Sequence, residues 1–103
     1  MIHVIATLEV KDGQRQTVLD AVKSIVPQVR AENGCIEYVP TVDLDAGIGA
    51  APRPNVVTVV EKWESREALA AHLEAPHMLG MRDKVGDIIV DRTIRVTEPA
   101  KLD

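Results

Sequence analysis

The 103-residue chain is 46% hydrophobic and 27% charged, which predicts one soluble globular domain over residues 1–103. A formal net charge of -4 and only two aromatic residues, Tyr38 and Trp63, argue against a basic surface that stacks bases, so we expect no nucleic acid partner. No apolar run is long enough to cross a bilayer, no signal peptide pattern follows Met1, and Cys35 has no second cysteine to pair with, so we expect a cytoplasmic protein without a membrane partner.

The N-terminal segment predicts a strand followed by a helix. Apolar residues alternate from Ile2 to Val10, as in a strand with one buried face. They then recur at helical spacing between Arg15 and Glu32. Pro27 predicts a kink or local break in this helix, because proline cannot donate a backbone hydrogen bond.

The next segment predicts a second strand and a loop. The strand covers Cys35 to Val42, with Ile36, Tyr38 and Val42 on one face. Residues 43–55 are rich in Gly, Ala and Pro and show little periodicity, which indicates a loop.

The third strand, Val56 to Trp63, is apolar on both sides. Val57 and Val59 point one way, and Val56 and Val60 point the other way. A strand that is apolar on both faces needs cover on both.

The last part of the chain predicts two short helices and a fourth strand. Ser65 is a suitable N-cap for a helix that runs to about Ala75. Pro76 interrupts this helix before a shorter helical segment over 77–85, and residues 88–96 form the fourth strand.

The order strand, helix, strand, strand, helix, strand predicts an α+β ferredoxin-like fold, in which helices cover one face of an antiparallel sheet. The apolar residues on the other face of the third strand predict a homodimer with the two sheets face to face, forming a dimeric α/β barrel.

His72 and Glu61 are the candidate catalytic residues. His72 follows Leu69 by three residues and Ala68 by four, so it lies on the side of its helix that faces the sheet. A buried, neutral imidazole suits a general base, and the structural alternative is a core histidine held by a hydrogen bond. Glu61 shares a strand face with Trp63 and is placed to orient His72, or to form a structural ion pair.

Trp63, Tyr38 and His77 are the candidate substrate-binding residues. Trp63 is suited to wall a flat pocket or to anchor the core. Tyr38 is suited to donate a hydrogen bond to a developing oxyanion, or is a half-buried strand residue with a solvated hydroxyl. His77, at the start of a helical segment, is a second acid–base candidate or a solvated capping residue.

No metal centre is predicted, because the three histidines lack the short two-histidine spacing of metal sites. Cys35 is predicted to be a buried structural thiol, since no partner for a nucleophilic role lies near it in the sequence.

Three stretches carry a family resemblance: Glu32–Tyr38, Val60–Leu73 and the pair Pro76-His77. Together they resemble the antibiotic biosynthesis monooxygenase domain, and within it the quinol monooxygenase branch. The resemblance implies a dimeric ferredoxin-like barrel that oxidises a small quinol or polyphenol with dioxygen, without flavin, haem or metal. It also implies a pocket formed by His72, Glu61, Trp63 and Tyr38.

The chain departs from this family pattern in places. Asn33 stands where proline is usual, and Met78 and Met81 stand where phenylalanine is common, which implies a more pliable cavity. Haem-degrading relatives carry an asparagine on the first strand, where this chain has Ala6 and Thr7. Two alternatives stay open: a small-metabolite isomerase of the same fold, and a non-catalytic ligand-sensing or stress-response dimer.

Overall fold

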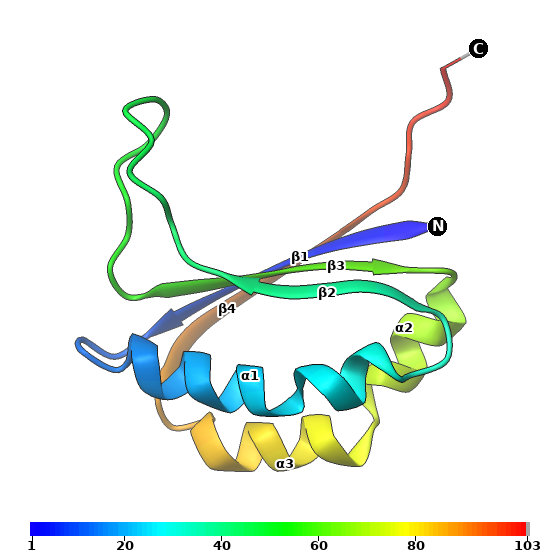
Figure 1. Cartoon of the computed structure of the whole chain (residues 1–103), viewed down its shortest axis with the longest axis horizontal. Coiled ribbons are helices and arrows are strands. Elements are labelled where there is room, and N and C mark those ends of the chain that lie inside the picture. Colours follow the sequence, from blue (N-terminus) through cyan, green and yellow to red (C-terminus); the bar gives the residue numbers. More distant parts are fainter. Residues whose placement is uncertain (103) are drawn as a thin grey trace.

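The computed structural model describes residues 1–102, so Asp103, the last residue of the predicted domain, lies outside it. Four strands and three helices follow one another in the order β1 (Ile2–Val10), α1 (Arg15–Arg30), β2 (Cys35–Thr41), β3 (Val56–Trp63), α2 (Arg66–Leu73), α3 (Pro76–Val85) and β4 (Ile89–Thr97) (Figure 1). The predicted ferredoxin-like α+β fold is confirmed.

The four strands form one antiparallel sheet in the order β2-β3-β1-β4. Helices α1 and α3 lie side by side beneath one face of this sheet, and α2 leads from β3 into α3 (Figure 1). The hydrophobic core fills the space between this face, here called the covered face, and the helices. No helix of residues 1–102 lies over the opposite face, here called the open face (Figure 1).

Strand β3 shows the predicted alternation. Val57, Val59, Glu61 and Trp63 are all buried on the covered face, as expected for residues two apart. Val60 lies on the open face and is only partly buried. The strand therefore brings one acid and the only tryptophan into the core.

Two expectations about the first half of the chain are wrong in detail. Helix α1 continues through Pro27 from Arg15 to Arg30, so the local break that was one form of the expectation does not occur. Ile36 does not share the face of Tyr38, because an irregularity in the pairing between Cys35 and Glu37 shifts the alternation of β2. Ile36 is consequently 50% exposed while Tyr38 is 2% exposed.

The turn between α1 and β2 is anchored to the start of α2. Gly34 has a φ of +85°, and a Cβ added there would lie 2.6 Å from the Cβ of Ala68. The carbonyl of Gly34 also accepts a hydrogen bond of 2.8 Å from the backbone N–H of Glu64. Position 34 requires glycine both because of its positive φ and because the backbone lies so close to Ala68. The contacts of Gly34 with Glu64 and Ala68 hold the end of α1 next to α2.

The helices of the second half begin largely as expected. The Ser65 hydroxyl accepts a hydrogen bond from the backbone N–H of Ala68 at 3.1 Å, which confirms it as the N-cap of α2. Helix α2 ends at Leu73, two residues before the expected end, and Pro76 itself occupies the first turn of α3. Within residues 1–102, no helix combines the length and apolar character that crossing a bilayer requires.

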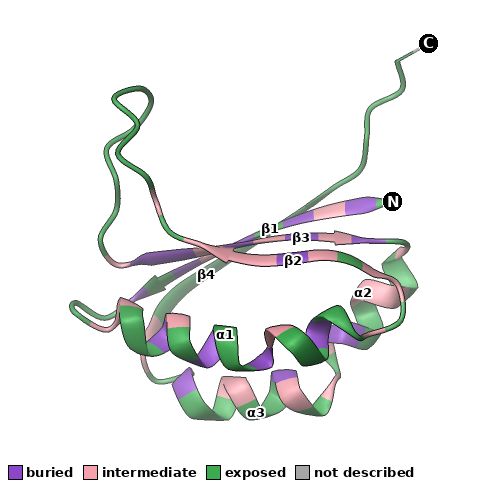
Figure 2. Cartoon of the chain, in the orientation of Figure 1, coloured by how far each residue is buried: buried purple, intermediate pink, exposed green. Residues whose placement is uncertain are grey.

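The loop over 42–55 and the segment after β4 are largely exposed, whereas the buried residues gather on the sheet and the helices (Figure 2). The loop expected at 43–55 is thus confirmed.

Cys35 is only partly buried. Burial, with a smaller contribution from the nearby Glu32 carboxylate, raises the pKa of its thiol. A raised thiol pKa disfavours the reactive thiolate, in keeping with a structural role.

Candidate functional site

A cavity of about 200 Å³ lies between the covered face of the sheet and the helices. Its walls are mainly apolar and include Met78 and Met81 of α3. The polar side chains that line it are Tyr38, Glu61, His72, Arg82 and Arg92. This combination of an apolar enclosure with a few convergent polar groups is typical of a small-molecule site.

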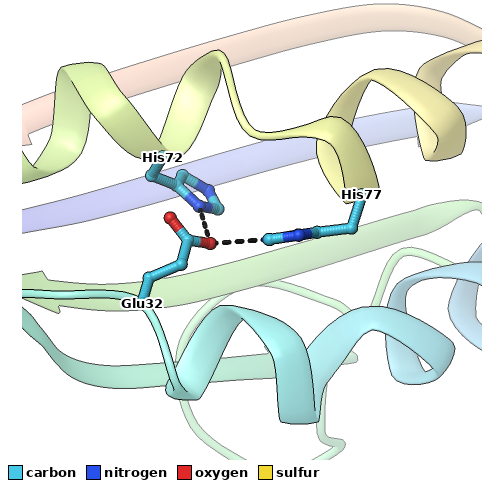
Figure 3. Close-up of side chains that lie close together, drawn as sticks. All are labelled: Glu32, His72 and His77. Carbon is cyan, nitrogen blue, oxygen red and sulfur yellow. Dashed lines mark hydrogen bonds and ion pairs between the residues drawn. The ribbon is translucent and has the colours of Figure 1, made fainter.

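His72 is the most buried polar group of the cavity, at 1% exposure. Its Nδ1 lies 2.9 Å from Glu32 Oε2, a hydrogen-bond distance (Figure 3). When Glu32 is a carboxylate it can only accept, so Nδ1 carries the proton and Nε2 keeps its lone pair. The imidazole is therefore held in the tautomer whose free nitrogen can take a proton.

Burial lowers the pKa of His72, while the hydrogen bond and the charge of Glu32 oppose this effect. The net shift is downward, which favours the neutral imidazole. The imidazole is therefore in the form that can act as a base near neutral pH.

Glu32 joins the two histidines of α2 and α3. The same oxygen, Oε2, lies 2.9 Å from His72 Nδ1 and 2.8 Å from His77 Nε2 (Figure 3). The side chains of Glu32 and His77 are 14% and 17% exposed, against 1% for His72. A hydrogen-bonded series thus runs from the buried His72 to a partly exposed His77.

The ligand atoms of Glu32, His72 and His77 all lie within 4.8 Å of one another, so these residues could hold a divalent metal ion. Two histidines and a carboxylate are a known ligand set of zinc. However, ligand atoms around a tetrahedral zinc stand roughly 3.3 Å apart for bonds of about 2.0 Å. The observed 2.8 and 2.9 Å separations are those of hydrogen bonds, so the arrangement fits a histidine–carboxylate–histidine network better than a metal site.

Glu61 does not orient His72. Its Oε1 lies 3.9 Å from His72 Nε2, too far for a hydrogen bond, and accepts instead a 2.9 Å hydrogen bond from Trp63 Nε1. Burial raises the pKa of Glu61 to about 7, against the lowering effect of the Trp63 hydrogen bond. Glu61 therefore exchanges its proton near neutral pH, beside the free nitrogen of His72.

Two aromatic rings enclose the imidazole. The ring centroid of Trp63 lies 4.6 Å from that of His72, and the centroid of Tyr38 lies 5.5 Å away in an edge-on arrangement. Tyr38 is 2% exposed, so it is not the half-buried residue that one sequence interpretation allowed. Burial raises the pKa of its hydroxyl, which therefore keeps its proton and can donate a hydrogen bond.

Of the five predicted site residues, three line the cavity: His72, Glu61 and Tyr38. Trp63 is fully buried behind His72, and His77 contacts Glu32, so neither is among the residues that line the cavity. The predicted site residues did not include Glu32, whose contact with His72 spans 40 residues, or the two arginines, Arg82 and Arg92. The signals available for Glu32 were its place at the end of the first predicted helix and at the start of the stretch Glu32–Tyr38 that carries the family resemblance.

The family match and the curated relatives of this chain agree on one protein family. Residues 1–84 match the family described as "Antibiotic biosynthesis monooxygenase". The chain is 39% identical over 102 residues to "Probable quinol monooxygenase YgiN" of Escherichia coli K12, covering 96% of this chain and 98% of that protein.

Solved structures share the fold. A structure from Nitrosomonas europaea superimposes with a TM-score of 0.84 at 22% identity, covering 98% of this chain and 100% of the other. Rv0793 of Mycobacterium tuberculosis superimposes with a TM-score of 0.80 at 25% identity, covering 97% of this chain and 95% of that one.

Proposed function

Because this chain belongs to the antibiotic biosynthesis monooxygenase family, we propose that it oxidises a small quinol-type aromatic with dioxygen, without flavin, haem or metal. The observation that carries the proposal is the neutral His72, whose Nδ1 is fixed by Glu32 while the imidazole lines an apolar cavity. A relative named as a probable quinol monooxygenase supports the same substrate class.

The reaction begins with removal of a hydroxyl proton of the hydroquinone by Nε2 of His72. The resulting anion is a far better electron donor than the neutral hydroquinone and passes one electron to dioxygen. Recombination of the two radicals and loss of water inserts one oxygen atom into the ring. The atoms of this reaction balance: one hydroquinone and one O2 become one hydroxyquinone and one water, and both hydrogens of the water come from the substrate.

Each of the other groups has a task in this scheme. Tyr38, held neutral, donates a hydrogen bond to the developing phenolate. Glu32 keeps His72 in the reactive tautomer, and His77 donates a second hydrogen bond to the same oxygen, which helps to hold Glu32 as a carboxylate. Met78 and Met81 supply a deformable apolar wall that excludes water from the anion.

The same proposal includes a homodimer built on the open face of the sheet. The strand register places Val39, Val60 and Ile5 in one row across β2, β3 and β1 on that face. Ile5 is 39% exposed, and Val39 and Val60 are partly buried. An apolar row in the middle of an uncovered sheet face favours a second copy of the chain as its cover.

Oxygen uptake tests the activity. A panel of reduced benzoquinones and naphthoquinones is incubated with the protein, with and without chelator, in an oxygen electrode. We expect uptake above the uncatalysed rate for at least one quinol, unchanged by the chelator. No enzyme-dependent uptake with any reduced quinone or polyphenol would refute the oxygenase and leave the isomerase or the ligand-sensing dimer.

A further inference from the structure

Two arginines line the cavity without an ionic partner. Arg82 comes from α3 and Arg92 from β4. Neither forms an ion pair with an acidic side chain among residues 1–102, whereas the exposed Arg53 is paired with Asp43. An unpaired guanidinium that lines an apolar cavity is a ready anchor for an anion.

The arginines stand at the mouth of the cavity. Together with Ile89 they also line a second depression on the outer surface, so their side chains lie between the cavity and solvent. Asp91 lines this outer depression but not the cavity. An anion that enters the cavity from this side meets two positive groups first.

The Arg92 end of the cavity is separate from the Glu61 end. Glu61 pairs with Val4 of β1, and Arg92 pairs with Leu8 of the same strand. Four residues of strand and two strand spacings separate the backbones of Glu61 and Arg92, about 13 Å along the strands and about 10 Å across them. Because both side chains extend toward the cavity, one small molecule can contact the two ends at once.

We propose that the substrate is a hydroquinone of one or two fused rings that carries a carboxylate on the side away from the reacting hydroxyl. This inference rests on the proposed function. The carboxylate is bound by Arg82 and Arg92, and the reacting hydroxyl faces His72. The cavity, at about 200 Å³, is below the usual size of sites for drug-like ligands, which limits the ring system.

The two arginines are the basic side chains of the cavity lining. The chain as a whole carries a net charge of -4, so attraction of an anion to the cavity depends on these two side chains. Planar guanidinium groups match the geometry of a carboxylate and can bind it through paired hydrogen bonds. The apolar walls then select an aromatic body over a sugar or an amino acid.

Binding of oxidised ligands tests the proposal without turnover. Trp63 is the only tryptophan and its ring centroid lies 4.6 Å from that of His72, so a quinone bound beside His72 should quench its fluorescence. The probes are a naphthoquinone and the same naphthoquinone carrying a carboxylate. We expect the carboxylated probe to bind at least about tenfold more tightly at low salt.

Arg82→Gln and Arg92→Gln should remove this difference and leave the affinity for the neutral probe unchanged. Arg66→Gln is the matched control, since Arg66 is exposed at the start of α2 and does not line the cavity. Equal affinity of the wild-type protein for both probes, or equal weakening of both by the Arg82 and Arg92 variants, would overturn the proposal.

The two proposals fail separately. Tighter, arginine-dependent binding of the carboxylated quinone without oxygen uptake from its reduced form would keep the anion site and refute the oxygenase. Oxygen uptake with neutral quinols and no preference for the carboxylated probe would keep the oxygenase and refute the anion site.

Discussion

The covered and open faces of the sheet are made by the same strands but differ in what they bury. On the covered face, β3 contributes Glu61 and Trp63 beside apolar side chains, and the helices add His72. On the open face, the same strand contributes Val60 and Lys62, which the chain itself leaves partly exposed. Residues two apart on one strand lie on the same face of the sheet, and residues one apart lie on opposite faces.

This difference separates chemistry from assembly. The covered face encloses ionisable groups away from water. Burial there raises the pKa of Glu61 to about 7 and lowers the pKa of His72. The open face carries a separate pocket at one end, lined by exposed acids such as Glu9 and Asp91, and its central row is apolar. Substitutions on the two faces should accordingly affect different measurements.

The largest effect is expected for His72→Ala on the covered face. Loss of the general base should lower kcat/KM for a quinol by about 100-fold to 10,000-fold. His3→Ala, a histidine at the end of the open face beyond the apolar row, is the control and should leave turnover unchanged. Steady-state oxygen uptake and thermal unfolding are measured for both; a loss of stability with unchanged turnover would show that His72 is only a core residue.

The next effect is expected for Glu61→Gln and appears in the pH dependence of stability. The folded protein keeps the Glu61 proton up to a pKa of about 7, whereas the unfolded chain releases it near 4.5, so wild-type stability falls as pH rises between these values. Glutamine has no proton to lose, so the variant lacks this fall. The free energy of unfolding of the variant, relative to that of the wild type, should therefore rise by on the order of 3 kcal/mol between pH 4 and pH 8.

Urea unfolding of both proteins at pH 4 and pH 8, at one protein concentration, measures this gain. The lowered pKa of His72 acts in the opposite direction, because the unfolded chain takes up a proton that the buried imidazole resists as pH falls. This contribution is common to the two proteins and cancels to first order in their difference. If the free energies of unfolding of the wild type and Glu61→Gln changed equally between pH 4 and pH 8, Glu61 would be ionised in the folded protein.

A smaller effect is expected for Gly34→Ala, which pushes apart the elements that carry Glu32 and His72. Both Gly34 and Gly13 have positive φ, but only at Gly34 would a Cβ meet another atom, the Cβ of Ala68 at 2.6 Å. Gly34→Ala should therefore destabilise the fold by about 2 kcal/mol more than Gly13→Ala, as expected for overpacking. Chemical unfolding of the pair measures the difference, and equal losses would mean that the contact with α2 relaxes freely.

The smallest effect is expected on the open face. Val60→Asp places a charge in the apolar row and should weaken dimerisation at least tenfold, since an unpaired charge is costly to bury. Sedimentation at micromolar concentration should show a wild-type dimer and a variant shifted toward monomer. A wild-type protein that is monomeric at that concentration would contradict the proposed assembly.

The covered face could be predicted from the sequence because its pattern is local. The alternation in β3 placed Glu61 with Trp63, and the helical spacing from Ala68 and Leu69 turned His72 toward the sheet. The contact of Glu32 with His72 could not be predicted in this way, because it depends on how the end of α1 docks against α2 through Gly34. The irregular pairing that turns Ile36 away from Tyr38 is likewise invisible to a strict period of two.

The central claim is that His72 activates a quinol for direct reaction with dioxygen. The most direct test follows isotopically labelled dioxygen into the product by mass spectrometry, with a parallel reaction in labelled water to account for exchange of carbonyl oxygens. We predict one labelled atom per product from dioxygen with the wild-type protein and almost none above the uncatalysed background with His72→Ala. Label that comes only from water, or equal incorporation by the two proteins, would contradict this claim.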